Sequence, residues 1–269
     1  MEPVVARFVH IYPTLASASS ALARHLSQAA RRSVRARGVF SWVVAGGHTP
    51  EGLYGLLASE YRVRFPWKET ELFFGDERCV GPRAPFSNYR MVRKSLISLV
   101  PLRRRNVHRM PGEVRPTSAA ARVYAREIES TRPHDRASPR FDVVLLGIGP
   151  DGHTASLFPR APALRERRRT VVPVLRAGQP PLVHRLTLTL PALASSREVC
   201  FLISGSDKAE VVGEIFRSFP QGSTALPASL VRSQGPTHWY LDRAAAAELP
   251  SSIARAAASR PAQNHRTSS

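Results

Sequence analysis

The sequence is poor in the features that mark disulfide-rich or membrane-bound proteins. Cysteine occurs only as Cys79 and Cys200, too few for a disulfide framework and not in a metal-ligand spacing. No apolar run approaches the roughly 18 residues that a membrane span requires. Residues 1–7 also lack the basic and then apolar pattern of a secretory signal. We therefore expect a cytoplasmic protein with reduced thiols and no membrane contact.

Lysine is scarce in a chain that is otherwise strongly basic. The net charge is +19, yet only three of the 39 basic residues are lysine. A basic excess is the electrostatic footprint of nucleic-acid binding, but the arginines are spread from Arg7 to Arg266, and no zinc-finger, RRM or basic-zipper pattern occurs. We expect a solvated basic surface and no specific nucleic-acid partner. Because lysine is rare in this chain, each lysine is a candidate for a ligand contact.

Strand-like and helix-like segments alternate along the chain. Without an internal repeat or a dividing linker, 269 residues suit one large domain. The expected strands are 4–11, 39–45, 71–74, a short one near 107, 141–146, 169–175, 185–188, 199–204 and 238–241; the expected helices are 14–37, one starting with Thr49 as N-cap, 88–99, 118–129, 207–216 and one opening at Asp242. This alternation predicts a Rossmann-like α/β fold, with a mostly parallel sheet and helices on both faces.

We expect residues 1–249 to form this single α/β domain with a small subsidiary lobe. The remaining residues, 250–269, are rich in Ala, Ser and Arg. They are predicted to be a disordered tail.

The segment 141–159 carries the most information about function. Four consecutive apolar residues, Val143 to Leu146, are typical of a strand buried on both faces, and a cluster of Gly, Pro and Asp then ends it. Asp151 and His153 follow at this break, at the strand end where open α/β sheets bind their ligands. An imidazole oriented by a carboxylate can act as a general base. The alternative is a surface turn that Asp151 merely stabilises.

Residues 147–152 also match the dinucleotide pattern G-x-G-x-x-G, but only formally. Pro150 interrupts the turn, and Val171 and Val172 stand where a ribose-binding acid is expected. We therefore expect no nucleotide cofactor. Neither a G-x-S-x-G nucleophile elbow nor a metal-ligand cluster occurs in the sequence, so no serine triad and no metal site are predicted.

A second glycine turn joins the strand 39–45 to the following helix. Gly46, Gly47 and Thr49 precede the positive end of that helix, which makes the turn a candidate phosphate site. A plain turn that binds nothing is equally compatible with the pattern. His48 is interpreted as a simple loop residue.

Three further places put charge at strand or helix ends. Asp76, Glu77 and Arg78 follow the strand 71–74, where an ion pair at the rim is the simplest alternative to a functional role. Arg185 starts a strand, and Lys208 lies in a first helical turn, where a lysine is unfavourable with the helix dipole. Both are candidates for binding phosphate.

Taken together, these motifs resemble the 6-phosphogluconolactonases, over roughly residues 5 to 247. The blocks that carry the resemblance are Gly46 to Pro50, Gly75 to Arg78 with Ser87 to Arg90, Leu146 to Pro159, Arg185 to Thr189, Gly205 to Lys208, and Trp239 to Asp242. The resemblance implies a fold shared with glucosamine-6-phosphate deaminase, no required cofactor, and hydrolysis of a sugar-phosphate lactone in the oxidative pentose phosphate pathway.

The alternatives to a lactonase are a deaminase-like sugar-phosphate enzyme and a non-catalytic anion-binding protein. Three blocks favour the lactonase over the deaminase: Gly75 to Arg78, the segment that follows His153, and Arg185 to Thr189. The chain departs from the family at His48, where lactonases usually have Ser, so one side-chain contact to phosphate is in doubt.

The resemblance and the residues together give a hypothesis for the site. His153 activates water, with Asp151 or Asp76 orienting its ring, and Arg78 stabilises the developing oxyanion. The phosphate is held by Arg185, Lys208 and the turn of Gly46, Gly47 and Thr49. We expect a monomer whose partner is a small phosphosugar lactone.

Overall fold

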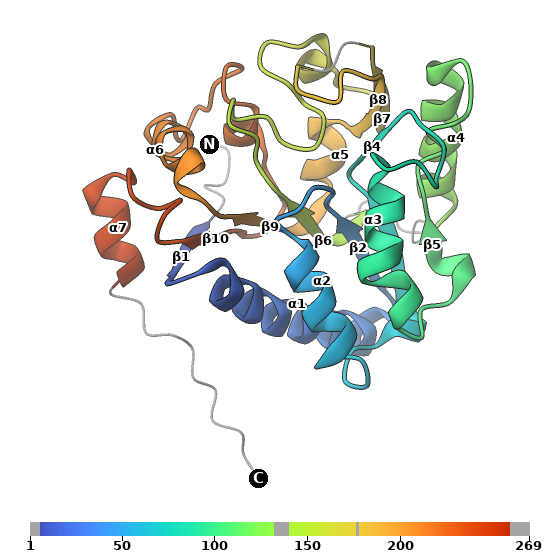
Figure 1. Ribbon diagram of the computed structural model, residues 1–269, viewed down its shortest axis with the longest axis horizontal. Coiled ribbons are helices and arrows are strands. Elements are labelled where there is room, and N and C mark those ends of the chain that lie inside the picture. The colour runs from blue at the N-terminus through green and yellow to red at the C-terminus, as the bar shows by residue number, and fades with distance from the viewer. Residues whose placement is uncertain (1–5, 132–139, 176–177, 259–269) are drawn as a thin grey trace.

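The computed structural model describes residues 6–131, 140–175 and 178–258, and within them a seven-stranded parallel sheet runs through the middle of the molecule (Figure 1). Its strands lie in the order β1 (Arg7–Tyr12), β10 (Thr237–Asp242), β9 (Ser196–Ile203), β6 (Phe141–Leu146), β2 (Phe40–Val44), β3 (Thr70–Phe74) and β5 (Val107–His108). All neighbouring pairs are parallel. The predicted α/β fold with a mostly parallel sheet is therefore confirmed.

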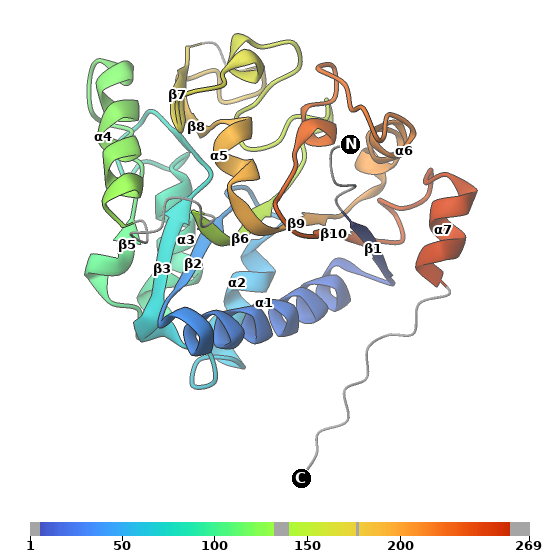
Figure 2. The same cartoon turned by 180° about the vertical axis from the view of Figure 1, so that it is seen from behind.

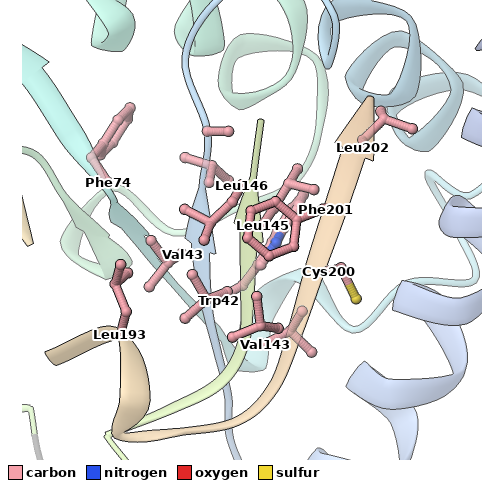
Figure 3. Close-up of a cluster of buried hydrophobic side chains, with 14 of the residues drawn as sticks. Trp42, Val43, Phe74, Val143, Leu145, Leu146, Leu193, Cys200, Phe201 and Leu202 are labelled. Carbon is pink, nitrogen blue, oxygen red and sulfur yellow. The ribbon is translucent and has the colours of Figure 1, made fainter. Parts of the chain in front are cut away.

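The central strand β6 is buried along its whole length. Its apolar side chains pack with those of β2 and β9, including Trp42 and Phe201, in the cluster that Figure 3 shows. Removing each such side chain from water contributes roughly 1.5–3 kcal/mol. A continuous apolar run is what a strand needs when helices cover both of its faces.

Seven α-helices are found in the described residues. They are α1 (Leu15–Arg37), α2 (Glu51–Ser59), α3 (Asn88–Ser95), α4 (Thr117–Ser130), α5 (Leu190–Ala194), α6 (Ala209–Arg217) and α7 (Ser251–Ala258). The longest, α1, begins at Thr14, whose hydroxyl accepts from the Ser17 amide in a capping box, and ends at Gly38 with φ 77°. Both ends of α1 agree with the sequence prediction.

Helices cover both faces of the parallel sheet. On one face, α1 runs beneath the strands and α2 lies beside it (Figures 1 and 2). On the other, Phe216 of α6 makes an edge-to-face ring contact with Trp239 of β10, and Trp239 stacks on Phe201 of β9. Because the strands are parallel, their carboxyl ends and the loops that follow them lie at the same edge of the sheet.

A second, small sheet stands beyond these strand ends. It is antiparallel and has the order β4 (Asp76–Arg78), β8 (Arg185–Leu188) and β7 (Val171–Val174), with α4 beside it (Figure 2). The sequence analysis placed Asp76 to Arg78 after the strand 71–74 and gave them no strand of their own. Instead, the chain bends at Gly75 and these three residues pair with β8.

Three local predictions are wrong. Pro50, not Thr49, occupies the N-cap position of α2, and no side chain caps that helix. The residues after Asp242 form turns rather than a helix, although the Asp242 carboxylate accepts from the Ala245 amide as an N-cap residue would. The expected disordered tail begins with a helix, α7, while residues 259–269 lie outside the described residues. No helix in the described ranges has the length and apolar character to span a bilayer.

Candidate active site

Glycine shapes the turn that follows β6. The Gly149 amide donates to the His153 carbonyl, and the Gly152 amide donates to the Gly149 carbonyl, which closes a compact loop. A Cβ atom on Gly149 would lie 2.0 Å from the His153 ring and 2.8 Å from Oδ1 of Asp151. Gly152 has φ +75°, where other residues are strained. These glycines, which formally match a nucleotide fingerprint, therefore make room for an imidazole and a carboxylate.

Asp151 holds the His153 ring in place. Its Oδ1 lies 2.5 Å from His153 Nδ1 and also accepts from the His153 amide at 3.2 Å. Partial burial opposes ionisation of Asp151, but the hydrogen bond and the charge of His153 lower its pKa to about 2. The ionised carboxylate thus fixes Nδ1, which leaves Nε2 as the nitrogen that can act on a bound molecule.

An aromatic ring supports the same imidazole from the side. Phe158 packs against His153 with ring centroids 4.7 Å apart. The Arg185 guanidinium lies over the Phe158 ring, 5.3 Å from its centroid. Gln179 joins these groups, since its carbonyl accepts from Arg185 and its side chain donates to Asp151 at 3.4 Å. Arg185 therefore belongs to the same cluster as Asp151 and His153.

Arg78 lies on the other side of the site, beside the turn of Gly46 and Gly47. Its Nη1 donates to Asn88 Oδ1 at 2.6 Å. Asn88 fills the space above Gly46, where a Cβ would come within 2.1 Å of the amide oxygen. Gly46 is therefore needed for the close approach of Asn88, and Asn88 brings Arg78 next to the turn.

The three charged residues of β4 all contact Asn88, but their other partners differ. Asp76 accepts from Asn88 Nδ2 at 3.1 Å and from the Ser156 hydroxyl at 2.6 Å. Glu77 is buried and accepts from the amides of Asn88 and Tyr89 at the start of α3. Burial raises the pKa of Glu77 despite these bonds. Asp76 therefore lies at the site, whereas Glu77 holds the α3 N-terminus.

Arg78 and Arg185 face each other across β4 and β8. Like charges at directly opposed positions are unfavourable, and burial lowers the pKa of Arg185, with the Arg78 charge adding to the effect. The buried Nε atoms of both arginines have no hydrogen-bond partner in the described part of the chain. Such a pair is suited to binding an anion, which would relieve the repulsion and supply acceptors.

These elements enclose a pocket of about 310 Å³, the size of a small sugar phosphate site. Among the predicted site residues, those that line it are Gly46, Gly47, Thr49, Asp76, Arg78, His153 and Arg185. Asp151 lies behind His153 and does not line the pocket. Of the two candidate orienters left open by the sequence, Asp151 is the one that contacts the imidazole.

Two other residues singled out in the sequence lie outside this pocket. Lys208 pairs with Asp207, with Nζ 2.7 Å from Oδ2, and is not among the lining residues. His48 is fully exposed and pairs with Glu51 on the surface of the turn. His48 stands where lactonases usually have Ser, yet the backbone of the turn at Gly46 and Gly47 still lines the pocket.

Sequence reasoning missed three residues of the site. Asn88 and Gln179 both line the pocket, and Ser156 donates to Asp76 from the turn after β6. The block Ser87 to Arg90 was noticed, but nothing in it distinguished Asn88 as the contact to Arg78. Gln179 had no sequence signal. Its partners Asp151 and Arg185 come from different elements.

The fold also brings together three possible metal-ligand residues that are far apart in the sequence. Although no ligand spacing is visible in the sequence, His25, Glu198 and His238 offer ligand atoms that all lie within 4.8 Å of one another. None of the three lines the pocket described above.

Comparison with known proteins agrees with this geometry. The family model described as glucosamine-6-phosphate isomerases/6-phosphogluconolactonase matches residues 13–239. A 6-phosphogluconolactonase of Streptomyces coelicolor is 40% identical over 224 residues, which are 81% of this chain and 85% of the relative.

Solved structures of the same two kinds of enzyme are similar to this chain. The crystal structure of 6-phosphogluconolactonase from Thermotoga maritima superposes with a TM-score of 0.77 at 30% identity, covering 88% of this chain and 100% of the other. A monomeric glucosamine-6-phosphate deaminase has the same TM-score at 20% identity, over 90% and 99% of the two chains. The second similarity shows the shared fold alone.

Proposed function

Because the chain belongs to the glucosamine-6-phosphate isomerase/6-phosphogluconolactonase family, we propose that it hydrolyses 6-phospho-D-glucono-1,5-lactone to 6-phospho-D-gluconate, in the oxidative pentose phosphate pathway. One observation carries this proposal. An Asp151–His153 pair faces a pocket that also holds two opposed, incompletely paired arginines, Arg185 beside the imidazole and Arg78 across the pocket. A base together with positive charge for a phosphate and for an oxyanion is what hydrolysis of a phosphorylated lactone requires.

In the proposed reaction, His153 acts as the general base. Its Nε2 removes a proton from water as the water oxygen attacks C1 of the lactone. Asp151, ionised at all ordinary pH values, stabilises the imidazolium that forms. When the tetrahedral intermediate collapses, the bond from C1 to the ring oxygen breaks, and the imidazolium returns the proton to that oxygen. The products are the carboxylic acid and a free hydroxyl, without a covalent enzyme intermediate.

The contacts favour an exchange of the roles expected for the two arginines. Arg78 lies next to the Gly46–Gly47 turn through Asn88, so it is the better-placed phosphate ligand, together with the positive end of α2. Arg185 packs on Phe158 beside His153, so it is the better-placed charge for the oxyanion at C1. Lys208, paired with Asp207 outside the pocket lining, is not needed in this arrangement.

Deamination of glucosamine 6-phosphate is the second candidate. Its support is limited to the fold, because the deaminase structure is only 20% identical. A non-catalytic anion-binding role would not require the imidazole that Gly149, Asp151 and Phe158 hold beside the anion site. Lactone hydrolysis uses all of these groups.

A direct assay tests the proposal. Freshly prepared 6-phosphogluconolactone is supplied, formation of 6-phosphogluconate is followed, and the spontaneous rate is subtracted; glucosamine 6-phosphate is the parallel substrate. The His153→Asn protein is the matched control, because it keeps a polar side chain but not the base. We expect lactone hydrolysis by the natural chain only. Ammonia release from glucosamine 6-phosphate, or equal rates for the two proteins, would contradict the proposal.

The cytoplasmic location and the monomeric state are further parts of the proposal. Gel filtration with light scattering tests the second of these.

A further inference from the structure

A second cluster of titratable side chains lies on the sheet face that α1 covers, away from the catalytic pocket. His10 is on β1, His238 on β10 and Glu198 on β9, the three adjacent strands at one end of the sheet. In the parallel register, His238 is opposite Cys200, two residues after Glu198, so their side chains share a face. His25 comes from α1. Figure 3 shows the Cys200 side chain pointing away from Phe201, as this alternation requires.

The ligand atoms of this cluster converge. His25 Nε2 is 2.7 Å from Glu198 Oε2, and His10 Nε2 is 3.1 Å from His238 Nδ1. One ligand atom from each of His25, Glu198 and His238 lies within 4.8 Å of the other two. Around a tetrahedral Zn²⁺, with bonds of about 2.0–2.2 Å, neighbouring ligand atoms are about 3.3 Å apart. Small side-chain rotations would therefore suffice to place these atoms around one ion.

The cluster is largely buried but remains accessible to solvent. The His25 and Glu198 side chains keep 19% and 20% of their surface exposed, which allows an ion to enter. Arg32 lies 3.6 Å from Glu198 Oε1, the oxygen that His25 does not contact, and the Arg32 side chain is 61% exposed. The guanidinium is thus free to point into solvent, while Oε2 faces the histidines.

Outside the pocket, two other histidine–carboxylate groups of the described residues lack this convergence of ligand atoms. His48 and Glu51 form a single exposed pair. His108 contacts Glu71 through Nε2 and Glu127 through Nδ1, so its two carboxylates lie on opposite edges of the ring. Neither arrangement directs three ligand atoms to one point. In the described residues, the search for such groups finds His25, Glu198 and His238.

We propose that His25, Glu198 and His238 form a structural site for one divalent transition-metal ion of the Zn²⁺ class. Imidazole with a single carboxylate suits Zn²⁺, Co²⁺ or Ni²⁺ rather than Mg²⁺ or Ca²⁺, which prefer oxygen ligands. The ion would link α1 to β9 and β10. Because no ligand is shared with the catalytic pocket, it would stabilise the fold without entering the reaction.

The test uses the full-length chain stripped with a chelator. Zn²⁺ is titrated calorimetrically, Co²⁺ is followed by its visible absorption, and Tm is measured with and without Zn²⁺. We expect one saturable site for each chain, a tetrahedral-type Co²⁺ spectrum and a higher Tm with Zn²⁺. His25→Gln and His238→Gln should each weaken Zn²⁺ binding by more than about tenfold, the lower end of what even outer-sphere partners cause, and should abolish the rise in Tm.

His48→Gln is the matched control, since it removes a histidine from a histidine–glutamate pair that has no third ligand. It should bind Zn²⁺ as the natural chain does. Lactone turnover by His25→Gln and His238→Gln confirms that these proteins are folded. The proposal is overturned if the natural chain shows no saturable Zn²⁺ site, if Mg²⁺ competes equally, or if His25→Gln and His238→Gln retain the affinity of the control.

Discussion

The two sheets of this protein contribute opposite kinds of residue to one pocket. The parallel sheet is largely apolar, and its central strand β6 is buried throughout, so it supplies polar groups mainly through the turns at its carboxyl edge. The antiparallel sheet has short strands, yet it carries Asp76, Arg78 and Arg185 within them. Buried like charges cost stability. In the proposed function, the large sheet therefore holds the fold and the turn of His153, while the small sheet supplies the charged groups that bind the substrate.

The largest effect should come from the catalytic turn. His153→Ala removes the proposed base, so we expect kcat to fall by about 10²–10⁴-fold with little change in KM. Asp151, with a pKa of about 2, should stay ionised over the whole working pH range. Steady-state kinetics measure kcat and KM of the variant. Near-normal turnover of the variant would remove His153 from the mechanism.

A smaller but related loss is expected from Gly149→Ala. The added Cβ would overlap the His153 ring, which must move by about an ångström or more. A displacement of this size can cost about 10²-fold in kcat. Gly55→Ala, in α2 with open space around the Cβ position, is the matched control and should keep full activity. If Gly149→Ala were as active as this control, the turn would not position the base.

Two variants of the small sheet separate the roles of its arginines. Removing a hydrogen bond to a charged group costs about 1.5–3 kcal/mol, or roughly 10- to 100-fold. For Arg78→Ala this loss should appear mainly as a higher KM, and for Arg185→Ala mainly as a lower kcat. Circular dichroism checks that both fold. The reverse pattern would restore the assignment made from the sequence, with Arg185 on the phosphate and Arg78 on the oxyanion.

The smallest effect concerns a polar group of the parallel sheet. Burial opposes protonation of His108, but its bonds to Glu71 and Glu127 raise its pKa above the ordinary 6.5. Its charged pairs therefore stabilise the fold fully below about pH 6.5 and lose this contribution as the pH rises through the folded-state pKa. His108→Gln should lower the free energy of unfolding by about 1 kcal/mol at mildly acidic pH and by less at alkaline pH.

Urea denaturation at the two pH values measures this difference, with lactone turnover as the second readout. Turnover should stay unchanged, because His108 does not line the pocket. A loss of turnover without a loss of stability would contradict the division of labour between the two sheets.

Local sequence signals were reliable where neighbours in the chain decide the structure. Thr14 and Gly38 marked the ends of α1, the apolar run 143–146 marked the buried strand, and Asp151 and His153 were recognised as a pair two residues apart. The same reasoning failed at Thr49, because Pro50 takes the cap position without a side-chain bond. It also failed for Asp76 to Arg78, whose strand exists only because β8 lies beside it.

By itself, the sequence determined the fold class and the turn after β6. The alternation of strand-like and helix-like segments, and the hydrogen bond between Asp151 and His153, both depend on local geometry. The contact between Asn88 and Gly46, the link from Gln179 to Asp151 and the meeting of His25 with Glu198 were decided only by the tertiary structure. These pairs are separated by 28 to 173 positions in the chain. No spacing rule connects residues so far apart, because only the register of the strands and the packing of α1 and α3 bring them together.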